Sequence, residues 1–316
     1  MRERTRLGLV ERLVLQTMAD IGAVRNSPYV KCARIVATVR SDHAVHDDQA
    51  YSTLCDLTAD WLQSVPLVDG HGNFGSADWS PSVSRYTEAR LSLAGLLAAQ
   101  SEGGELPPLP FGLILGDMYA GGTAPPFEPS RVLDALTLAI DHPDSIDDDL
   151  AAAVGPPVFP TGCSVHVDLS ALHAGDRTRL RMSAQISVEA IDGGPRLVIT
   201  NLPLGIGRND VLVSISGRSR PIENADHHPA LAAATRLPIV ELNDESDRRG
   251  TRILCTLRDG ADVGQTIGQL LGLWPVSVER SCRLDAPIGT LVRQAVDDDP
   301  SAQLDAIARL RAAIPQ

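Results

Sequence analysis

The chain has 316 residues, 43% of them hydrophobic, so it is long enough for two domains with cores of their own; with only 3% aromatic residues, those cores must rest on aliphatic side chains. It carries 28 basic and 40 acidic residues, a formal net charge of −12, which argues against a general nucleic-acid binder with a basic surface. The charge is unevenly distributed along the chain: residues 1–105 hold 10 basic and 13 acidic side chains, and the remaining residues hold 18 and 27. A local basic patch in residues 1–105 could therefore still bind phosphate.

The sequence also predicts neither a membrane span nor export. No stretch approaches the ~18 consecutive apolar residues of a membrane span, and the charged start lacks the cleavage site of a secretion signal. The five cysteines are odd in number and never spaced as CxxC, which indicates buried thiols in a reducing compartment. We therefore expect a cytoplasmic protein.

Three helices are predicted near the start of the chain. Apolar residues at helical spacing predict the first over residues 9–21, and a proline in the first turn favours a second from Pro28 to about Arg40. The third is predicted over 45–61, where apolar residues recur every three or four positions. Three short helices in succession, the last two closely joined, are typical of a helix-turn-helix domain.

An extended segment is predicted next. Three glycines between residues 70 and 75 interrupt regular structure, and SRYTEARL then alternates as a strand does. In that strand Tyr86, Glu88 and Arg90 would share one face. The run SEGGELPPLP, residues 101–110, combines glycine, proline and charge without periodicity, and we interpret it as the domain boundary.

The second half is predicted to be mixed. A helix is expected over 131–141 and a hairpin from 179–191 and 196–201 around Asp192-Gly193-Gly194. A second strand pair is expected over 237–242 and 251–257, and helices are expected to dominate after residue 261, with a break at 297–300.

The pair Arg85-Tyr86 has the chemistry of a phosphoryl-transfer site. A tyrosine phenol titrates near ~10, so it needs an activating environment to act as a nucleophile, and an adjacent guanidinium can stabilise charge on a phosphate. Taken alone, this dipeptide is more typical of a half-buried strand tyrosine.

The surroundings of the pair change that interpretation. LVDGHGNFGS followed by RYTEARLS closely resembles the LVDGQGNFGS…RYTEARL signature of the A subunits of bacterial type IIA topoisomerases, DNA gyrase and topoisomerase IV. Shorter matches such as SPYVKCARIV, GGTAPPFEPSRVLDAL and NDESDRRGTRILCTLR follow in the family's order. The resemblance identifies the chain as a divergent, shortened member of that family.

The resemblance implies an α+β fold. Residues 1–105 would form a winged-helix domain bearing the nucleophile, and residues 106–316 an α/β tower domain. The coiled-coil C-gate and the DNA-wrapping C-terminal domain are expected to be lacking, because the chain ends near the point where the family begins them.

The resemblance also implies a reaction and its partners. Tyr86 would attack double-stranded DNA to give a 5′-phosphotyrosyl link, with Arg85 stabilising the transition state. Mg²⁺ would come from the TOPRIM domain of a separate B-type subunit, whose ATPase domain binds ATP. A homodimer through the winged-helix domain and association with the nucleoid are expected.

Four further side chains are expected at DNA. Lys31 and Arg34 lie one helical turn apart and match the basic positions of the family's YKKSAR helix. His43 matches the first histidine of its HPHGD motif, and Arg12 in GLVERLVLQTM is also assigned to DNA. The cluster DHAVHDD that contains His43 has the residue types of a metal site, but its place at a helix start favours capping.

The chain also departs from the family. Val45 and His46 stand where HPHGD has its second histidine and its glycine, and Ala124 stands where the family has the isoleucine that wedges between base pairs. The arm that carries a further catalytic arginine has no counterpart in the chain.

Two interpretations follow. The intact LVDG…RYTEARL region favours an enzyme, a cleavage and religation subunit that works with a B-type partner. The departures favour a non-catalytic DNA-binding or decoy protein that occupies a gyrase partner or its DNA. We favour the enzyme, and both are carried forward.

Overall fold

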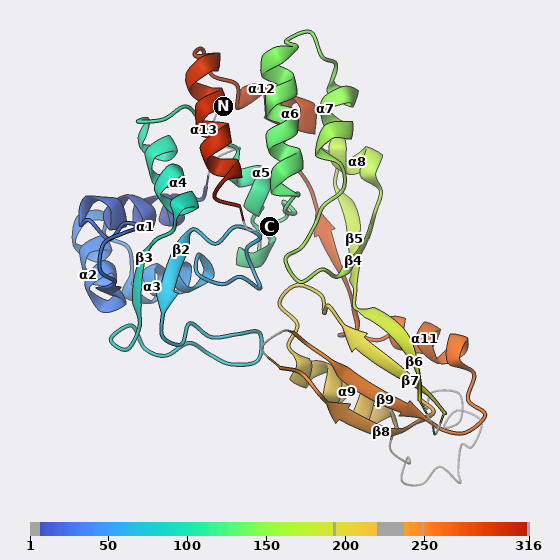
Figure 1. Cartoon of the computed structure of the whole chain (residues 1–316). Coiled ribbons are helices and arrows are strands. Elements are labelled where there is room, and N and C mark those ends of the chain that lie inside the picture. The colour runs from blue at the N-terminus through green and yellow to red at the C-terminus, as the bar shows by residue number, and fades with distance from the viewer. Residues whose placement is uncertain (1–6, 192–193, 220–236, 248–249, 315–316) are drawn as a thin grey trace. The chain divides into compact units, whose positions relative to one another are not determined.

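The structure is a computed structural model that describes residues 7–191, 194–219, 237–247 and 250–314 (Figure 1). Helices and antiparallel sheets both contribute, which confirms the predicted α+β class. In the described ranges no helix is both long enough and apolar enough to cross a membrane. All five cysteines are buried free thiols, as predicted.

The chain divides into two compact units. The first contains residues 1–160, 167–179 and 281–316, and the second contains residues 161–166 and 180–280. The expected boundary at 101–110 lies inside the first unit and stays a prediction about subdomains. There the α4 helix ends at Gly104, a left-handed cap, and the Ser101 hydroxyl accepts a hydrogen bond from the Leu109 amide, 2.9 Å.

The first unit is mainly helical. Its helices are α1 (Leu9–Asp20), α2 (Cys32–His43), α3 (Asp47–Asp56), α4 (Leu93–Gly103), α5 (Phe111–Leu115), η2 (Met118–Ala120), α6 (Pro129–Asp141), α7 (Asp147–Val154), α8 (Leu169–His173), α12 (Ile288–Gln294) and α13 (Pro300–Arg311).

The three helices predicted near the start are present with different bounds. The second begins at Cys32 and not at Pro28, because Val30–Lys31 is extended and pairs with another strand. The third ends at Asp56, short of Trp61. The break predicted at 297–300 lies between α12 and α13, where the Asp299 side chain caps the new helix.

A small antiparallel sheet follows the three helices. Strand β3 (Glu88–Leu91) lies between β1 (Val30–Lys31) and β2 (Val68–His71). Glu88 and Arg90 share a face of β3, as predicted, but Tyr86 does not belong to the strand. It lies in the turn that precedes β3, so the extended segment, predicted from Ser84, began four residues too early.

The second unit is built on a four-stranded sheet. Its strands and helices are β5 (Thr178–Ser183), β6 (Gln185–Ile191), β7 (Gly194–Thr200), α9 (Arg208–Ser219), β8 (Ile239–Asp244), β9 (Ile253–Leu257), α11 (Val263–Leu271) and β10 (Ser277–Cys282), with β4 (Ser164–Val167) before them. The order is β6-β7-β9-β8, and both predicted strand pairs are confirmed as antiparallel neighbours.

In this unit the observed strands differ from the predicted ones at a few positions. The first predicted strand is divided into β5 and β6 at Ala184, and β10, which pairs with β5, was not expected among the helices after residue 261. The turn residues Asp192 and Gly193 lie outside the described residues. One cluster of buried residues from β7, β9, α9 and α11 forms the core of the unit.

The start of α4 fixes the position of β2 in the first unit. Ser92 caps the helix by accepting a hydrogen bond from the Gly95 amide, 3.0 Å, and its hydroxyl donates to the Pro66 carbonyl, 2.9 Å. A Cβ atom on Gly95 would lie 1.8 Å from the Leu67 carbonyl oxygen. The helix therefore packs directly on the backbone that enters β2, and only glycine allows this approach.

Gly95→Ala should lower the free energy of unfolding by about 3 kcal/mol or more, because the clash is with backbone that cannot rotate away. Urea denaturation followed by circular dichroism measures the loss. Gly268→Ala in α11 is the matched control, because nothing lies within 4 Å of the added Cβ. It should be neutral or slightly stabilising, and an equally small effect of Gly95→Ala would contradict this packing.

Candidate functional site

Arg85 and Tyr86 are both exposed in the turn before β3. The Tyr86 side chain is 69% exposed, and the Arg85 guanidinium lies 5.8 Å from the centre of its ring. In the part of the chain that the structure describes, neither side chain has a hydrogen-bond partner. A phenol in this position is accessible to a large ligand.

The turn itself is held firmly. The half-buried Tyr51 hydroxyl donates to the Ser82 carbonyl, 2.5 Å, and accepts from the Thr87 hydroxyl, 2.9 Å. Burial raises the pKa of Tyr51 to about 12, so this phenol stays protonated and keeps donating. Within the turn, the Tyr86 amide donates to the Val83 carbonyl, 2.9 Å.

Helix α2 is joined to the same turn. At its N-terminus the Cys32 amide donates to the Thr87 carbonyl, 3.0 Å, and the Ala33 amide donates to the Ser84 carbonyl, 3.1 Å. These amides have no partners inside the helix, so the turn completes the hydrogen bonding of α2. The turn that contains Arg85 and Tyr86, which we call the tyrosine turn, therefore forms one rigid element with the start of α2.

The predicted DNA contacts divide into two groups. Lys31 and Arg34 are exposed at the start of α2, beside the turn. His43 is exposed at the other end of α2, about 14 Å farther along the helix axis. Arg12 is half-buried on α1, and its Nε atom is buried without a hydrogen-bond partner. The structure thus brings Lys31 and Arg34, but not His43, close to the backbone of the turn.

The DHAVHDD cluster caps a helix, as we favoured. The His46 ring accepts a hydrogen bond from the Asp48 amide at the N-terminus of α3, 3.3 Å, and Asp47 pairs with Arg40, 2.9 Å. Among the described residues there is no group of three or more histidine, cysteine or acidic side chains arranged to hold a metal ion.

The sequence reasoning missed the polar face of the small sheet. Lys31, Glu88 and His71 form one cross-strand row: the Lys31 ammonium lies 2.8 Å from one carboxylate oxygen of Glu88, and the His71 Nδ1 lies 3.4 Å from the other. The Lys31 ammonium, and after it His71, holds the pKa of Glu88 below its ordinary value. The alternation in RYTEARL was the available signal, but it could not identify the partner strands.

A second row lies beside the first. Asp69 accepts hydrogen bonds from the Tyr29 hydroxyl and from Arg90, both 2.9 Å, and the Arg90 guanidinium lies 4.2 Å from the centre of the Tyr29 ring. Arg90 also donates to the Ser27 carbonyl, 3.1 Å. Arg90 is thereby fully engaged in holding β1, β2 and β3 together.

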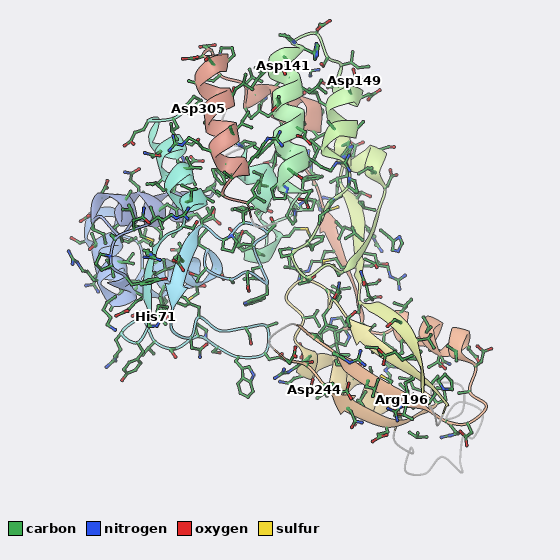
Figure 2. All side chains as sticks on the ribbon, in the orientation of Figure 1. His71, Asp141, Asp149, Arg196, Asp244 and Asp305 are labelled. Atoms are coloured by element: carbon green, nitrogen blue, oxygen red, sulfur yellow. The ribbon has the colours of Figure 1, made fainter. Side chains whose placement is uncertain are left out.

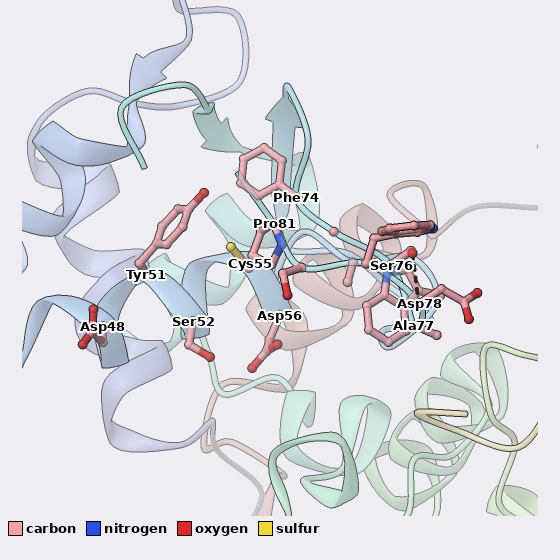
Figure 3. A pocket seen from close by; sticks show the side chains of 15 residues that line it. Asp48, Tyr51, Ser52, Cys55, Asp56, Phe74, Ser76, Ala77, Asp78 and Pro81 are labelled. Atoms are coloured by element: carbon pink, nitrogen blue, oxygen red, sulfur yellow. Dashed lines mark hydrogen bonds between the residues drawn. The ribbon is translucent and has the colours of Figure 1, made fainter. Parts of the chain in front are cut away.

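An open hollow of about 430 Å³ lies between α3 and the loop 74–81 (Figure 3). Its lining includes the aromatic residues Tyr51, Trp61, Phe74 and Trp79, together with Asp56. Burial, and after it the negative charge of Glu11, raises the pKa of Asp56 to about 6. Because burial disfavours the charged form, ionisation of this carboxylate lowers the free energy of unfolding.

Comparison with known proteins identifies the family. A family model that describes the A subunits of DNA gyrase and topoisomerase IV matches residues 7–102. This segment contains α1, α2 and α3, the small sheet of β1, β2 and β3, and the tyrosine turn. The DNA gyrase A subunit of Thermotoga maritima is 30% identical over 287 residues, which cover 83% of this chain and 34% of that protein. The gyrase A subunit of Kosmotoga olearia is 29% identical over 80% of this chain and 33% of that protein. The gyrase A subunit of Clostridium acetobutylicum is 27% identical over 92% of this chain and 36% of that protein.

The chain is a divergent member of the DNA gyrase and topoisomerase IV A-subunit family. It spans about a third of the length of the gyrase A subunits that it matches. At one departure from the family pattern, Ala124, this gyrase A relative uses its backbone to close a turn: the Ala124 amide donates to the Asp117 carboxylate, 2.7 Å, and its carbonyl accepts from the Asp117 amide, 2.9 Å.

Asp56→Asn should stabilise the protein by about 1–2 kcal/mol at pH 8, a value reduced because the carboxylate is partly open to solvent. A carboxyl whose pKa is raised to about 6 binds its proton more tightly in the folded than in the unfolded chain, so its contribution to stability falls as the pH rises from about 4 through about 6. The gain from asparagine should therefore nearly vanish at pH 4.

Urea denaturation of both proteins at the two pH values measures the difference. Asp60→Asn, at an exposed position four residues along, should change the stability by less than about 0.5 kcal/mol at either pH. A gain from Asp56→Asn that is equal at pH 4 and pH 8 would contradict the buried, destabilising carboxylate.

Proposed function

We propose that this chain cleaves and religates double-stranded DNA as the A-type component of a type II topoisomerase, with Tyr86 as the nucleophile. The observation that carries the proposal is an exposed phenol, without a described partner, in a turn held by Tyr51 and by the start of α2. Phosphoryl transfer gains most of its rate from positioning, and the fixed turn supplies a defined position for the attacking oxygen.

The proposed step exchanges one phosphoester for another. The Tyr86 oxygen bonds to phosphorus and the P–O3′ bond breaks, so that the phosphorus stays on the 5′ side as a phosphotyrosyl ester. The phenol loses its proton to solvent, and the departing 3′ oxygen takes one up. Religation is the reverse of this step and needs no energy source, because the number of ester bonds does not change.

Arg85 is proposed to stabilise the transition state. Its guanidinium lies in the same turn as Tyr86 and has no hydrogen-bond or ion-pair partner among the described residues, so it is available to the charge that grows on the phosphate oxygens. Lys31 and Arg34 at the start of α2 are proposed to hold the neighbouring phosphates, since the hydrogen bonds from Cys32 and Ala33 fix that helix to the same turn.

The domain arrangement and the partners follow from the family. We propose a winged-helix domain over residues 1–105 and a tower domain over 106–316, a homodimer through the winged-helix domain, and a B-type partner with TOPRIM and ATPase domains. That partner would bind ATP and supply Mg²⁺, which neutralises phosphate charge during cleavage.

A decoy is the second candidate function. The net charge of −12 and the ion pair between Lys31 and Glu88 weaken attraction to DNA, and Val45, His46 and Ala124 depart from the family pattern. A decoy would occupy the B-type partner or its DNA without forming a covalent link.

The chain, mixed with DNA, Mg²⁺ and its cognate B-type partner and then denatured, should yield a covalent protein–DNA adduct on a gel. Tyr86→Phe should abolish the adduct, because the nucleophilic oxygen is missing. Arg85→Ala should reduce the cleavage rate about 100-fold, the size of effect seen when one donor to a developing oxyanion is removed.

Tyr29→Phe is the matched control, since it removes the hydroxyl of a tyrosine that directly precedes β1 and bonds to Asp69 of β2, while keeping the ring. It should still form the adduct. If wild type forms no adduct with its cognate partner, or if Tyr86→Phe forms one, the cleavage proposal is wrong; an adduct-free chain that still inhibits the partner would establish the decoy.

A further inference from the structure

The row Lys31–Glu88–His71 has one carboxylate for two basic groups. Register places all three residues opposite one another across β1, β3 and β2, so their side chains leave the sheet on the same face. Glu88 divides its two oxygens between Lys31, 2.8 Å, and His71, 3.4 Å. His71 stands at the end of β2 (Figure 2), with its side chain 74% exposed.

The ring of His71 is held in place on this face. It packs at a tilt against the Tyr29 ring, with 5.7 Å between ring centres. The other charged groups of the face, Asp69 and Arg90, bind each other at 2.9 Å and carry no net charge together. The charge of the face therefore depends on Lys31, Glu88 and the protonation of His71.

The row lies beside the tyrosine turn. A Cβ atom on Gly72, the residue after His71, would lie 3.1 Å from the Tyr86 carbonyl oxygen, so the end of β2 and the turn are in direct contact. Lys31 is joined to the same turn through Cys32, whose amide donates to the Thr87 carbonyl, 3.0 Å. A phosphate held by the row would therefore lie next to a phosphate that Tyr86 could reach.

We propose that the row is a proton-dependent phosphate site that contacts the DNA backbone next to Tyr86. With neutral His71, Lys31 and Glu88 cancel and the row has no net charge. With protonated His71, the same row carries one net positive charge: Glu88 stays bound to the imidazolium, and the exposed Lys31 ammonium can turn to a phosphate. Histidine is the type of side chain that most often serves as a charge switch near physiological pH.

This inference rests on the proposed DNA binding and adds to it one contact residue, His71, and one condition, the protonation of that residue. It predicts that DNA binding tightens as the pH falls, and that the change depends on one histidine. The site is generic for nucleic-acid backbone, because it recognises charge and not base identity.

The test uses the full chain and a short fluorescein-labelled DNA duplex, with binding followed by fluorescence anisotropy. Between pH 8 and pH 6 the affinity of the wild type should rise about three- to tenfold. The slope of log affinity against log salt should steepen by about 0.9, the value for one additional phosphate contact.

His71→Gln should bind as the wild type does at pH 8 and should lose this rise, because the glutamine cannot be protonated. The substitution is exposed, so the fold should be retained. Glu88→Gln gives the opposite change: at pH 8 its row already has one net positive charge, and it should bind about as tightly as the wild type does at pH 6. His142→Gln, an exposed histidine at the end of α6, is the control and should keep the whole pH dependence.

The outcomes separate this inference from the proposed function. If the chain binds DNA but His71→Gln keeps the pH dependence of the wild type, the proton-dependent row is wrong and the cleavage proposal stands. If the chain and its cognate partner bind no DNA at either pH, both are overturned.

Discussion

The fixed geometry of the tyrosine turn depends on the hydrogen bonds at the start of α2. The first amides of any helix lack partners within the helix, and here those of Cys32 and Ala33 are satisfied by carbonyls of the turn. Tyr51 adds a second attachment from α3 through the Ser82 carbonyl and the Thr87 hydroxyl. Two helices thus hold one short turn, and these bonds set the direction of its exposed side chains.

This arrangement is compatible with the proposed phosphate contacts, although the protein is acidic as a whole. Residues 1–105 hold 10 basic and 13 acidic side chains, so most of the net charge of −12 lies later in the chain, and the face next to Tyr86 has its acids paired: Asp69 with Arg90 and Glu88 with Lys31. Pairing removes the repulsion that free carboxylates would exert on a polyanion. Pairing also limits the attraction to a polyanion, so a single proton or substitution changes the net charge on this face.

The sequence predicted much of this arrangement, and the reasons for its failures are specific. Apolar periodicity located α1 and α3, because one apolar face of each helix packs in the core, and the proline at residue 28 located α2 approximately. It did not predict that Val30–Lys31 is extended, because strand pairing with β3 is a tertiary interaction that overrides the helix-favouring proline. For the same reason, alternation alone extended β3 through Tyr86, where the bonds to α2 instead impose a turn.

The candidate site was predicted unevenly. Arg85 and Tyr86 came from a resemblance and not from their own spacing, since an isolated RY pair carries little information. The pairing of Glu88 with Lys31 and His71 depends on three strands that are separate in sequence, and no local pattern specifies which residues face one another across them. Side chains that act through cross-strand pairs become visible only when the register is known.

The central claim is that Tyr86 is the residue that joins to DNA, and peptide mapping of the trapped adduct tests it most directly. The adduct formed with the cognate B-type partner is digested with nuclease and then with trypsin, which cleaves after Arg85 and Arg90 and releases the five-residue peptide YTEAR. The account predicts that this peptide carries the added mass of a 5′-phosphorylated nucleotide and that fragmentation places it on Tyr86. Added mass on any other peptide, or an unmodified YTEAR peptide from a purified adduct, would contradict the account.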